Sequence, residues 1–429
     1  MAYNTSKSSA LMASRFDLSC RPYASPSSIS TVSSICRSLA YRNARRMSNE
    51  SADVLVVGAG IIGLSVARDC ARAGLSVLVL EHRDPRRSAS WAAAGILPHR
   101  RRELAKSAYS AAIAISSEEH ESLASELLEE TGVRDGYERC GELEIALSEA
   151  SAIALDARLR SYREEGVVVE RLDERQTAEI EPTLNAGMLH ASYHLPETAQ
   201  VRPPRRLRAL KLSCAALGVR IDDNAQVDGL LRSGARVIGV TCGGMRIFGG
   251  VTVVAAGAWS GRLFACAPLP VRPTRGRLVL LQDARRTLQR IVTNGAEYLV
   301  PRADGEVLLG STMEDVGFDD RTTAGAVAEL ISRSTALVPR LRRAHVAKTW
   351  AGLRPSTPDA RPMIGWAPGH PGLLLATGHE RLGFQMAPAT ARAVRQLIMG
   401  EPPCIDLEEF RAERFVVPGS SIPQPSASA

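Results

Sequence analysis

Three glycines near the start of the chain have the spacing of a loop that binds nucleotide phosphates. Gly58, Gly60 and Gly63 follow an apolar, β-branched run and precede a segment of helical periodicity. The first glycine permits a tight turn, the second lets a pyrophosphate approach the backbone, and the third lets helix and strand pack closely. A second apolar run ends at Glu81, whose carboxylate can accept hydrogen bonds from ribose hydroxyls. The pattern predicts a bound dinucleotide, and alone it does not choose between FAD and NAD.

A run of small residues favours FAD. SASWAAAGILPH, residues 88–99, lies just beyond Glu81 and is either an alanine-rich helix start or a backbone that lies flush against a flat ring. Two further strand-to-helix turns occur in VTVVAAGAWSG (251–261), which contains Gly257, and in GLLLATGHERLGFQMAPATA (372–391). Three such turns, far apart in the chain, suit a long, extended dinucleotide.

One permanently charged residue lies in an unusual context. Arg354 falls within WAGLRPSTPDARPMIG, residues 350–365, where proline, glycine and small residues argue against an ordinary helix or a central strand. We therefore expect a tight turn at this position.

The elements around these motifs predict an α/β fold. Strand–helix segments at 52–135, 199–265 and 345–405 predict a discontinuous, doubly wound, Rossmann-like domain that binds FAD. Residues 136–198 and 266–344 predict an interleaved α+β substrate domain on a mainly antiparallel sheet, with a hairpin at Asp304-Gly305. A helix is predicted over 116–130, opened by a capping box at Ser116-x-x-Glu119 and ended by Gly132. Another is predicted over 148–165, and residues 406–429 are predicted to be a C-terminal tail.

The N-terminal 48 residues explain the basic character of the chain. They contain seven Lys and Arg against one Asp, so they carry +6 of the formal net charge of +7. They also hold thirteen serines and no continuous apolar segment, which is typical of an organelle transit peptide rather than a secretory signal. We expect residues 1–50 to address the protein to the plastid stroma, with the mitochondrion as the alternative. The charge therefore gives no reason to expect a nucleic-acid partner.

Composition excludes two further classes. No apolar run approaches the roughly 20 residues of a membrane-spanning helix. The eight cysteines form no C-x-x-C pair, so neither a metal site nor a disulfide framework is expected.

Taken together in this order and spacing, the motifs resemble the glycine oxidase branch of the D-amino-acid oxidase superfamily. The resemblance runs from about Val54 to Ile398 and includes GAGIIGLSVARDCARAG, SWAAAGIL, VVAAGAWSG, EYLVPRADGEVLLGSTM, WAGLRPSTPDARPMIG and ATGHERLGFQMAPATA. It implies non-covalently bound FAD. The cofactor contacts that follow from the motifs and the resemblance are Gly58, Gly60, Ile61, Ile62, Gly63, Glu81, His82, Ala89, Ser90, Ala94, Gly95, Ile96, Val227, Gly257, His379, Glu380, Arg381, Leu382, Gly383, Phe384 and Gln385.

The resemblance also assigns three substrate residues. Arg354 matches an arginine that binds the substrate carboxylate, and a planar guanidinium can do so through two parallel hydrogen bonds that lysine cannot reproduce. Tyr298 matches a tyrosine whose hydroxyl approaches the same carboxylate, and Arg381 matches a second arginine near the site. The alternatives are a structural ion pair for Arg354, a strand aromatic for Tyr298 and a surface charge for Arg381.

One segment departs from the family pattern. The usual run is an aromatic residue, then Arg-Asn-Gly, then two aliphatic residues, whereas this chain has Glu380-Arg381-Leu382-Gly383-Phe384-Gln385. Glu380 places a carboxylate beside the proposed cation, and Leu382 lacks an amide. The departure leaves FAD binding in place and puts the choice of substrate in doubt.

The implied reaction is oxidative deamination of glycine, with sarcosine or small D-amino acids as further substrates. Hydride passes from the substrate Cα to flavin N5, O2 is reduced to H2O2, and no side-chain base is required. By family, the product iminoacetate would supply thiamine thiazole synthesis, which leaves open a hand-off to a thiazole synthase and a homo-oligomer. The alternatives are a D-amino-acid dehydrogenase, a sarcosine-type N-methyl amine oxidase, a catalytically silent FAD-binding subunit, and a nicotinamide dehydrogenase.

Overall fold

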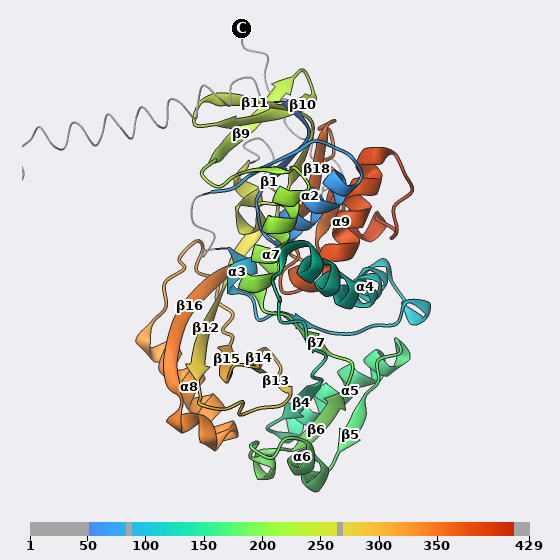
Figure 1. Cartoon of the computed structure of the whole chain (residues 1–429). Coiled ribbons are helices and arrows are strands. Elements are labelled where there is room, and N and C mark those ends of the chain that lie inside the picture. The colour runs from blue at the N-terminus through green and yellow to red at the C-terminus, as the bar shows by residue number, and fades with distance from the viewer. Residues whose placement is uncertain (1–50, 83–87, 264–268, 416–429) are drawn as a thin grey trace, which may run out of the picture. The chain divides into compact units, whose positions relative to one another are not determined.

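The computed structural model describes residues 51–82, 88–263 and 269–415 (Figure 1). The predicted transit peptide at 1–50 and residues 416–429 of the predicted tail lie outside the described residues. The described residues all belong to one compact unit, so the division into two domains stays a prediction. Within the described ranges, no helix is long and apolar enough to cross a membrane.

The first of two large sheets carries the glycine turn. Its central strands are parallel: β1 lies between β2 and β11, β8 pairs with β2, and β18 pairs with β11. An antiparallel strand β17 extends one edge, and the antiparallel pair β9–β10 continues from β11. Its strands are β1 (Ser51–Val57), β2 (Val77–Leu80), β8 (Arg220–Asp222), β9 (Val227–Ser233), β10 (Arg236–Cys242), β11 (Met245–Val254), β17 (Met363–Trp366) and β18 (Leu373–Thr377).

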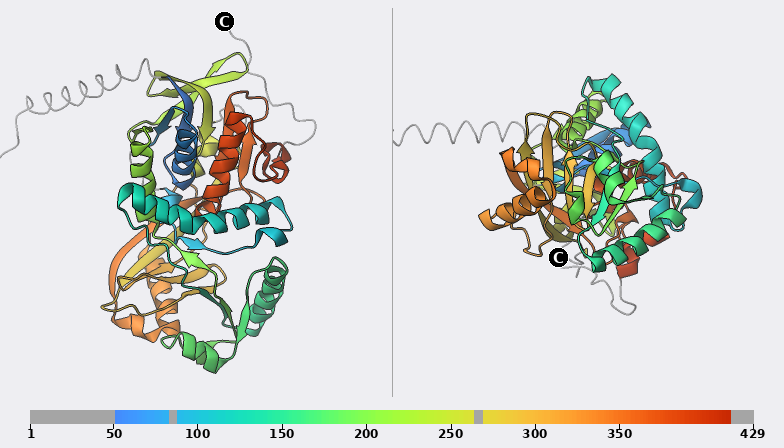
Figure 2. Two further views of the ribbon diagram at one scale, coloured as in Figure 1. Left: turned by 45° about the vertical axis from the view of Figure 1, so that its right-hand side comes forward. Right: turned by 90° about the horizontal axis from the view of Figure 1, so that it is seen from below.

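Helices pack on this sheet and on one another (Figure 2). Helix α2 contacts both α7 and α9, and α4 contacts the same two helices. Their apolar side chains form one core cluster with β1 and β2, which includes Val54, Leu64, Leu210 and Met386. The helices are α2 (Ile61–Arg72), α3 (Ala89–Ala92), α4 (Ala108–Thr131), α7 (Pro203–Ala216) and α9 (Gly383–Met399). Parallel strands joined to covering helices confirm the predicted Rossmann-like α/β fold.

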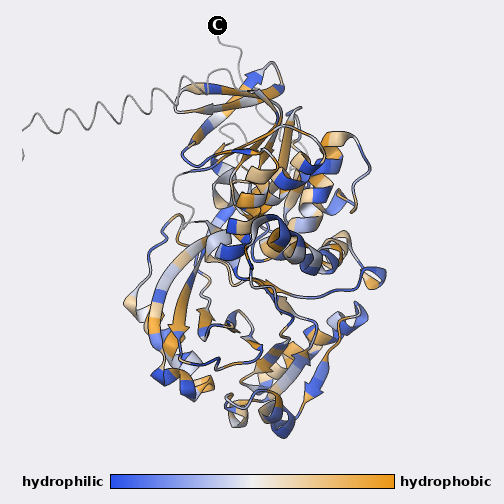
Figure 3. Ribbon diagram, viewed as in Figure 1, coloured by the Kyte–Doolittle hydropathy of each residue, from blue (hydrophilic) through white to orange (hydrophobic). Residues whose placement is uncertain are grey.

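The second large sheet is antiparallel except where β13 pairs with β4. Helix α8 covers β12 and β15. Apolar side chains of the helix and the sheet form a second core cluster, and the strands of this sheet contain orange, hydrophobic stretches in Figure 3. Its strands are β4 (Glu142–Ala146), β5 (Glu170–Leu172), β6 (Ala191–Leu195), β12 (Arg272–Gln282), β13 (Ile291–Asn294), β14 (Glu297–Pro301), β15 (Glu306–Gly310) and β16 (His345–Ser356). The helices that follow its strands are α5 (Glu149–Glu164), α6 (Glu174–Ile180) and α8 (Ala324–Leu337), and the short pair β3 (Ile96–Leu97) and β7 (Ala199–Gln200) forms a third sheet.

One predicted helix start is wrong. Helix α4 begins after Ser107, whose hydroxyl and that of Ser110 form the capping box, and not at Ser116. The Ser116 hydroxyl is instead buried in mid-helix and accepts a hydrogen bond from the backbone of Ala389 in α9. Strand β16, which begins at the start of the third predicted FAD-binding segment, pairs with β12 in the second sheet.

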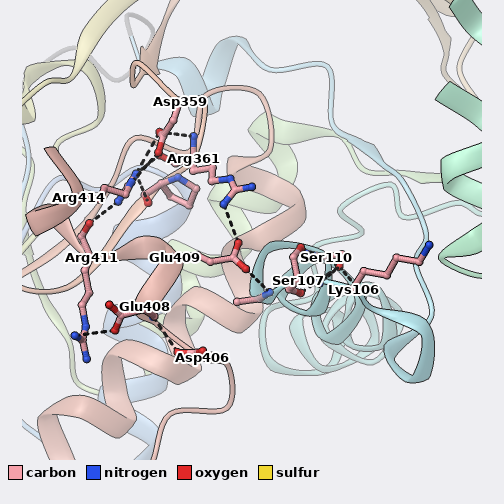
Figure 4. A network of polar contacts seen from close by, with 12 residues as sticks. Lys106, Ser107, Ser110, Asp359, Arg361, Asp406, Glu408, Glu409, Arg411 and Arg414 are labelled. Atoms are coloured by element: carbon pink, nitrogen blue, oxygen red, sulfur yellow. Dashed lines mark hydrogen bonds and ion pairs between the residues drawn. The ribbon is translucent and has the colours of Figure 1, made fainter. Parts of the chain in front are cut away.

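Part of the predicted C-terminal tail packs against the fold (Figure 4). Arg414 forms an ion pair with Asp359 at 2.7 Å, and Arg361 forms one with Glu409 at 3.0 Å. The Glu409 carboxylate also accepts a hydrogen bond from the backbone of Ala108, the first residue of α4. These contacts join the β16–β17 loop, the C-terminal segment and the start of α4.

Candidate active site

The glycine turn after β1 requires glycine at two positions. Gly58 has φ +106°, and a Cβ there would lie 2.5 Å from the carbonyl oxygen of Ala255 in the strand end beside it. A Cβ on Gly63 would lie 1.8 Å from the carbonyl oxygen of Gly58, so this glycine lets α2 sit directly on the turn. Gly60 is the N-cap of α2 and offers no side-chain cap to the first helical N–H groups. The turn is therefore a backbone cradle of the kind that binds phosphate.

Two polar side chains face this cradle. The Glu81 carboxylate accepts a hydrogen bond from the backbone of Ala59 at 2.5 Å, and Ser90 Oγ accepts one from Ile61 at 3.0 Å. Burial raises the pKa of Glu81, while backbone hydrogen bonds from Ala59 and His82 lower it. Glu81 directly follows β2, the position at which the sequence predicts an acceptor for the ribose hydroxyls.

A cavity of about 530 Å³ follows the carboxyl ends of β1, β2, β11 and β18. Fifteen of the predicted cofactor residues lie on its wall. They are Gly58, Gly60, Ile61, Ile62, Glu81, His82, Ala89, Ser90, Val227, Gly257, His379, Glu380, Arg381, Gly383 and Phe384. A cavity that is lined by several strand ends and includes the glycine cradle in its wall fits a dinucleotide such as FAD.

The other predicted cofactor residues are not among those that line the cavity. Gly63 packs α2 against the turn, and Leu382 is the N-cap of α9. The Gln385 side chain donates to Ile113 O at 3.1 Å and to Ser117 Oγ at 2.9 Å, so it joins α9 to α4. Residues 94–96 directly follow Ala93, which is on the wall.

His379, on this wall, and His120, the other buried histidine of the described residues, are not placed for acid–base chemistry. His379 Nε2 lies 3.1 Å from Thr390 Oγ1, and burial lowers the pKa of this histidine to about 3. His120 of α4 lies 3.1 Å from the carbonyl oxygen of Gln385, and burial lowers its pKa to about 3 as well. Both rings are therefore neutral near neutral pH and hydrogen-bonded within the protein.

Arg354 lies in edge strand β16, so the predicted turn at this residue is wrong. An edge strand tolerates the adjacent Pro355 because no further strand needs its missing N–H group. The guanidinium donates to Thr312 O at 3.2 Å and to Ser311 Oγ at 2.5 Å. It forms no ion pair with any carboxylate of the described residues, which argues against the structural ion pair. Arg354 itself is not on the cavity wall, but Pro355 is.

Tyr298 shares its surroundings with Arg354. The tyrosine ring lies over Gly310 of β15, where an added Cβ would be 2.6 Å from the ring and its hydroxyl. Arg354 contacts the next two residues of the chain, Ser311 and Thr312. The structure therefore brings the two residues that are proposed to bind the substrate carboxylate to one segment of the second sheet.

Two glycines that make room for these side chains were missed in the sequence. An added Cβ on Gly276 of β12 would lie 2.3 Å from Nη1 of Arg354, and Gly310 has the same relation to Tyr298. Both occur inside strand patterns, RPTRGRLVLLQ and GEVLLG, where an isolated glycine indicates a close approach. The two glycines therefore indicate a close approach in the sequence alone, but they do not identify the side chain that makes it.

Arg381 lies on the cavity wall and is half-exposed. Its Nε is 3.9 Å from Glu380, which has φ +47° and donates its backbone N–H to the carbonyl oxygen of Pro355. Glu380 therefore ties the turn before α9 to the residue that follows Arg354.

A buried carboxyl on β4, that of Glu142, is linked to Tyr298 through the strand between them, β13. Thr293 of β13 is opposite Tyr298, and its hydroxyl donates to Glu142 at 2.7 Å. Burial, and secondly the charge of Glu144, raises the pKa of Glu142 from 4.5 to about 7. In this range the folded protein holds a proton that the unfolded chain has released, so stability falls as pH rises from 4.5 to 7.

Replacing Glu142 with glutamine is expected to remove this loss of stability. The variant should gain roughly 1–3 kcal/mol in the free energy of unfolding over the wild type at pH 8, and much less at pH 5. Denaturant titrations at the two pH values measure it, and Glu164→Gln on exposed α5 is the control. Parallel pH profiles for Glu142→Gln and the wild type would contradict the assigned shift.

Comparison with known proteins identifies the class of protein that this fold and cavity define. A model of the FAD-dependent oxidoreductase family matches residues 53–397, and the chain belongs to that family. The protein is therefore an FAD-dependent enzyme.

Three individual proteins are similar to this chain over most of its length. The chain is 37% identical over 360 residues to the glycine oxidase of Pseudomonas aeruginosa, a match that covers 82% of this chain and 96% of that protein. It is 31% identical over 382 residues to the bifunctional protein ThiO/ThiG of Nostoc, covering 88% of this chain and 57% of that one. Among solved structures, the glycine oxidase of Geobacillus kaustophilus matches with a TM-score of 0.81 at 29% identity, over 86% of this chain and all of the other.

Proposed function

We propose that this enzyme oxidatively deaminates glycine, with sarcosine and small D-amino acids as further substrates. The observation that carries the proposal is Arg354, a guanidinium without a carboxylate partner among the described residues, beside Tyr298 and next to a residue of the FAD cavity wall. The similarity to glycine oxidases supports the same substrate class. The proposed cofactor contacts and substrate residues are those named above.

The side chains do little beyond positioning the substrate. Arg354 binds the carboxylate through its fork, and the Tyr298 hydroxyl donates to the same group. Bound FAD supplies a two-electron acceptor that O2 reoxidises, which converts the amine to an imine that water hydrolyses. Because His379 and His120 are buried and already hydrogen-bonded, neither takes the proton of the substrate ammonium, so the amine is expected to bind in its neutral form.

Anaerobic mixing of the FAD-loaded protein with a substrate panel tests the proposal. Glycine is expected to bleach the flavin absorbance, and sarcosine and D-alanine to do so as well. Admitting O2 should then restore the absorbance with one H2O2 per turnover. No bleaching by any amine would refute the proposal, and bleaching without peroxide would indicate a dehydrogenase. Bleaching by sarcosine but not glycine would indicate an N-methyl amine oxidase.

We also propose that residues 1–50 direct the enzyme to plastids, where its imine product would be used for the thiazole of thiamine. The relatives that carry a second, ThiG part are consistent with hand-off to a thiazole synthase. A fluorescent fusion of residues 1–50 would show plastid import, and mitochondrial or cytosolic fluorescence would contradict it. Size-exclusion chromatography with light scattering would show whether the enzyme is a homo-oligomer.

A further inference from the structure

Arg302 is a buried cation that the proposed function does not use. It follows β14, the strand that carries Tyr298, and only 7% of its surface is exposed. A buried charge is costly unless it is paired, so its partners need an explanation.

All three hydrogen-bond acceptors of Arg302 are neutral. The guanidinium donates to Gln200 Oε1 at 2.6 Å, to Val201 O at 3.0 Å and to Ala94 O at 2.7 Å. Within the described part of the chain it forms no ion pair. The carboxylates that act on it from nearby, Asp304 and Glu306, are already paired with Arg202, and Asp304 also lies 3.6 Å from Arg205. Burial, and secondly the charge of Arg202, lowers the pKa of Arg302 to about 10, which leaves it protonated at neutral pH.

The Ala94–Gly95 peptide that Arg302 holds lies between a hydrogen-bonded residue and the cavity wall. Gly95 has φ +76°, its carbonyl oxygen accepts from the backbone of Val201 at 2.8 Å, and an added Cβ would lie 2.2 Å from Val201 O. On the other side, Ala93 is part of the FAD cavity wall. Arg302 thus connects the substrate-binding strand β14 to the segment that leads directly onto that wall.

A cation on a peptide carbonyl has an electrical effect as well as a mechanical one. It withdraws electron density from the C=O group, which makes the N–H of the same peptide, here that of Gly95, a stronger donor. The positive charge also acts through a low-dielectric interior, where it is poorly screened. Both effects favour negative charge on a group bound at this wall.

We propose that Arg302 is a positioning residue for FAD, which fixes the Ala94–Gly95 peptide and uses its unpaired charge to favour the anionic reduced form of the cofactor. The proposal rests on the proposed function in one respect, the assignment of residues 94–96 to the flavin. It predicts that a neutral side chain at position 302 makes the bound flavin harder to reduce.

The test compares the reduction potentials of bound FAD in holoenzymes. In Arg302→Met we expect the two-electron reduction equilibrium to shift at least tenfold against reduction, which is a decrease of about 30 mV. Arg302→Lys keeps the charge and should stay within threefold of the wild type. Arg100→Met is the matched control, because Arg100 is also 7% exposed and lies six residues beyond Ala94, but pairs with Glu165 instead. Its potential should not change, although its melting temperature should fall.

A wild-type potential in Arg302→Met would overturn the proposal, and so would an equal shift in Arg100→Met, since that shift would be general loosening of the fold. If Arg302→Met does not retain FAD, Arg302→Gln makes the same comparison, because its amide can still donate to Ala94 O. The potentials are measured without substrate. A wild-type enzyme inactive on glycine would therefore refute the proposed function and leave this test intact.

Discussion

Replacing Arg354 with alanine is expected to lower kcat/KM for glycine by about a hundredfold to a thousandfold, while the enzyme retains FAD. The expected decrease in kcat/KM follows from the cost of removing one partner of a desolvated charge pair, which is typically about 2–5 kcal/mol. A loss of about 1.36 kcal/mol in transition-state stabilisation lowers the rate tenfold. FAD should stay bound because the Arg354 side chain is not on the cavity wall, and among the described residues its hydrogen bonds go to Ser311 and Thr312. Steady-state peroxide production measures kcat/KM, and the flavin absorbance of the purified variant shows whether FAD is retained.

Lysine at position 354 should recover little of this loss, because an ammonium cannot make two parallel hydrogen bonds to a carboxylate. Arg361→Ala is a suitable control. Arg361 lies seven residues further along the same segment, is more exposed, and pairs with Glu409 near the C-terminus. Its removal should leave kcat/KM for glycine unchanged. Undiminished turnover in Arg354→Ala would remove this arginine from the active site and with it the main support for an amino-acid substrate.

Local features of the fold could be predicted from the sequence because their causes lie within a few residues. The turn at Gly58–Gly63 needs glycine for its own backbone, the Asp304-Gly305 hairpin joins β14 to β15, and Gly132 ends α4 with φ +69°. The parallel order of β1 and β2 then follows, because a helix must return the chain to the same edge.

Features that depend on distant partners could not be predicted. Ser116 has the sequence pattern of a helix cap, but α9, more than 250 positions later, supplies the N–H that uses its hydroxyl. Arg206 lies in the basic run RPPRRLRALK, and nothing in that run indicates that this arginine is 1% exposed and paired with Asp135. Pairing across the chain also placed Arg354 in a strand, since β12 provides the hydrogen bonds that its proline-rich sequence does not indicate.

The same limit applies to the candidate site. The wall residues in the glycine-turn motifs were predictable because these motifs are strand ends, and strand ends of one parallel sheet meet at one edge. Ala89, Ser90 and Val227 are not at the carboxyl ends of strands, and they followed from the family resemblance instead. The relation between Arg354 and Gly276 was not predictable, because it depends on the register of β12 with β16, in which Gly276 is opposite Gly352 and Thr274 is opposite Arg354. Register therefore decides which glycine the guanidinium covers.

Replacing Gly276 with alanine should consequently disable Arg354 without touching it. The new Cβ would lie 2.3–2.5 Å from three guanidinium atoms, which form the end of a flexible side chain, so the arginine should move and the backbone should not. Gly276 has no positive φ, and so alanine fits its backbone and stability should be unchanged or slightly improved. We expect kcat/KM for glycine to fall by about a hundredfold, the effect of misplacing a positioning group by about 1 Å. Gly325→Ala, whose Cβ meets no atom within 4 Å, should have no effect on kcat/KM.

A double-variant comparison shows whether Gly276 acts only through Arg354. Adding Gly276→Ala to Arg354→Ala should cause no further loss of kcat/KM, because the side chain that the new methyl group displaces is already absent. Additive losses would mean that Gly276 contributes to the site in another way, such as by direct contact with the substrate. Wild-type kinetics in the single Gly276→Ala variant would mean instead that the guanidinium does not lie over Gly276 when glycine is bound. The glycine thus tests the position of the arginine, whereas Arg354→Ala tests only its presence.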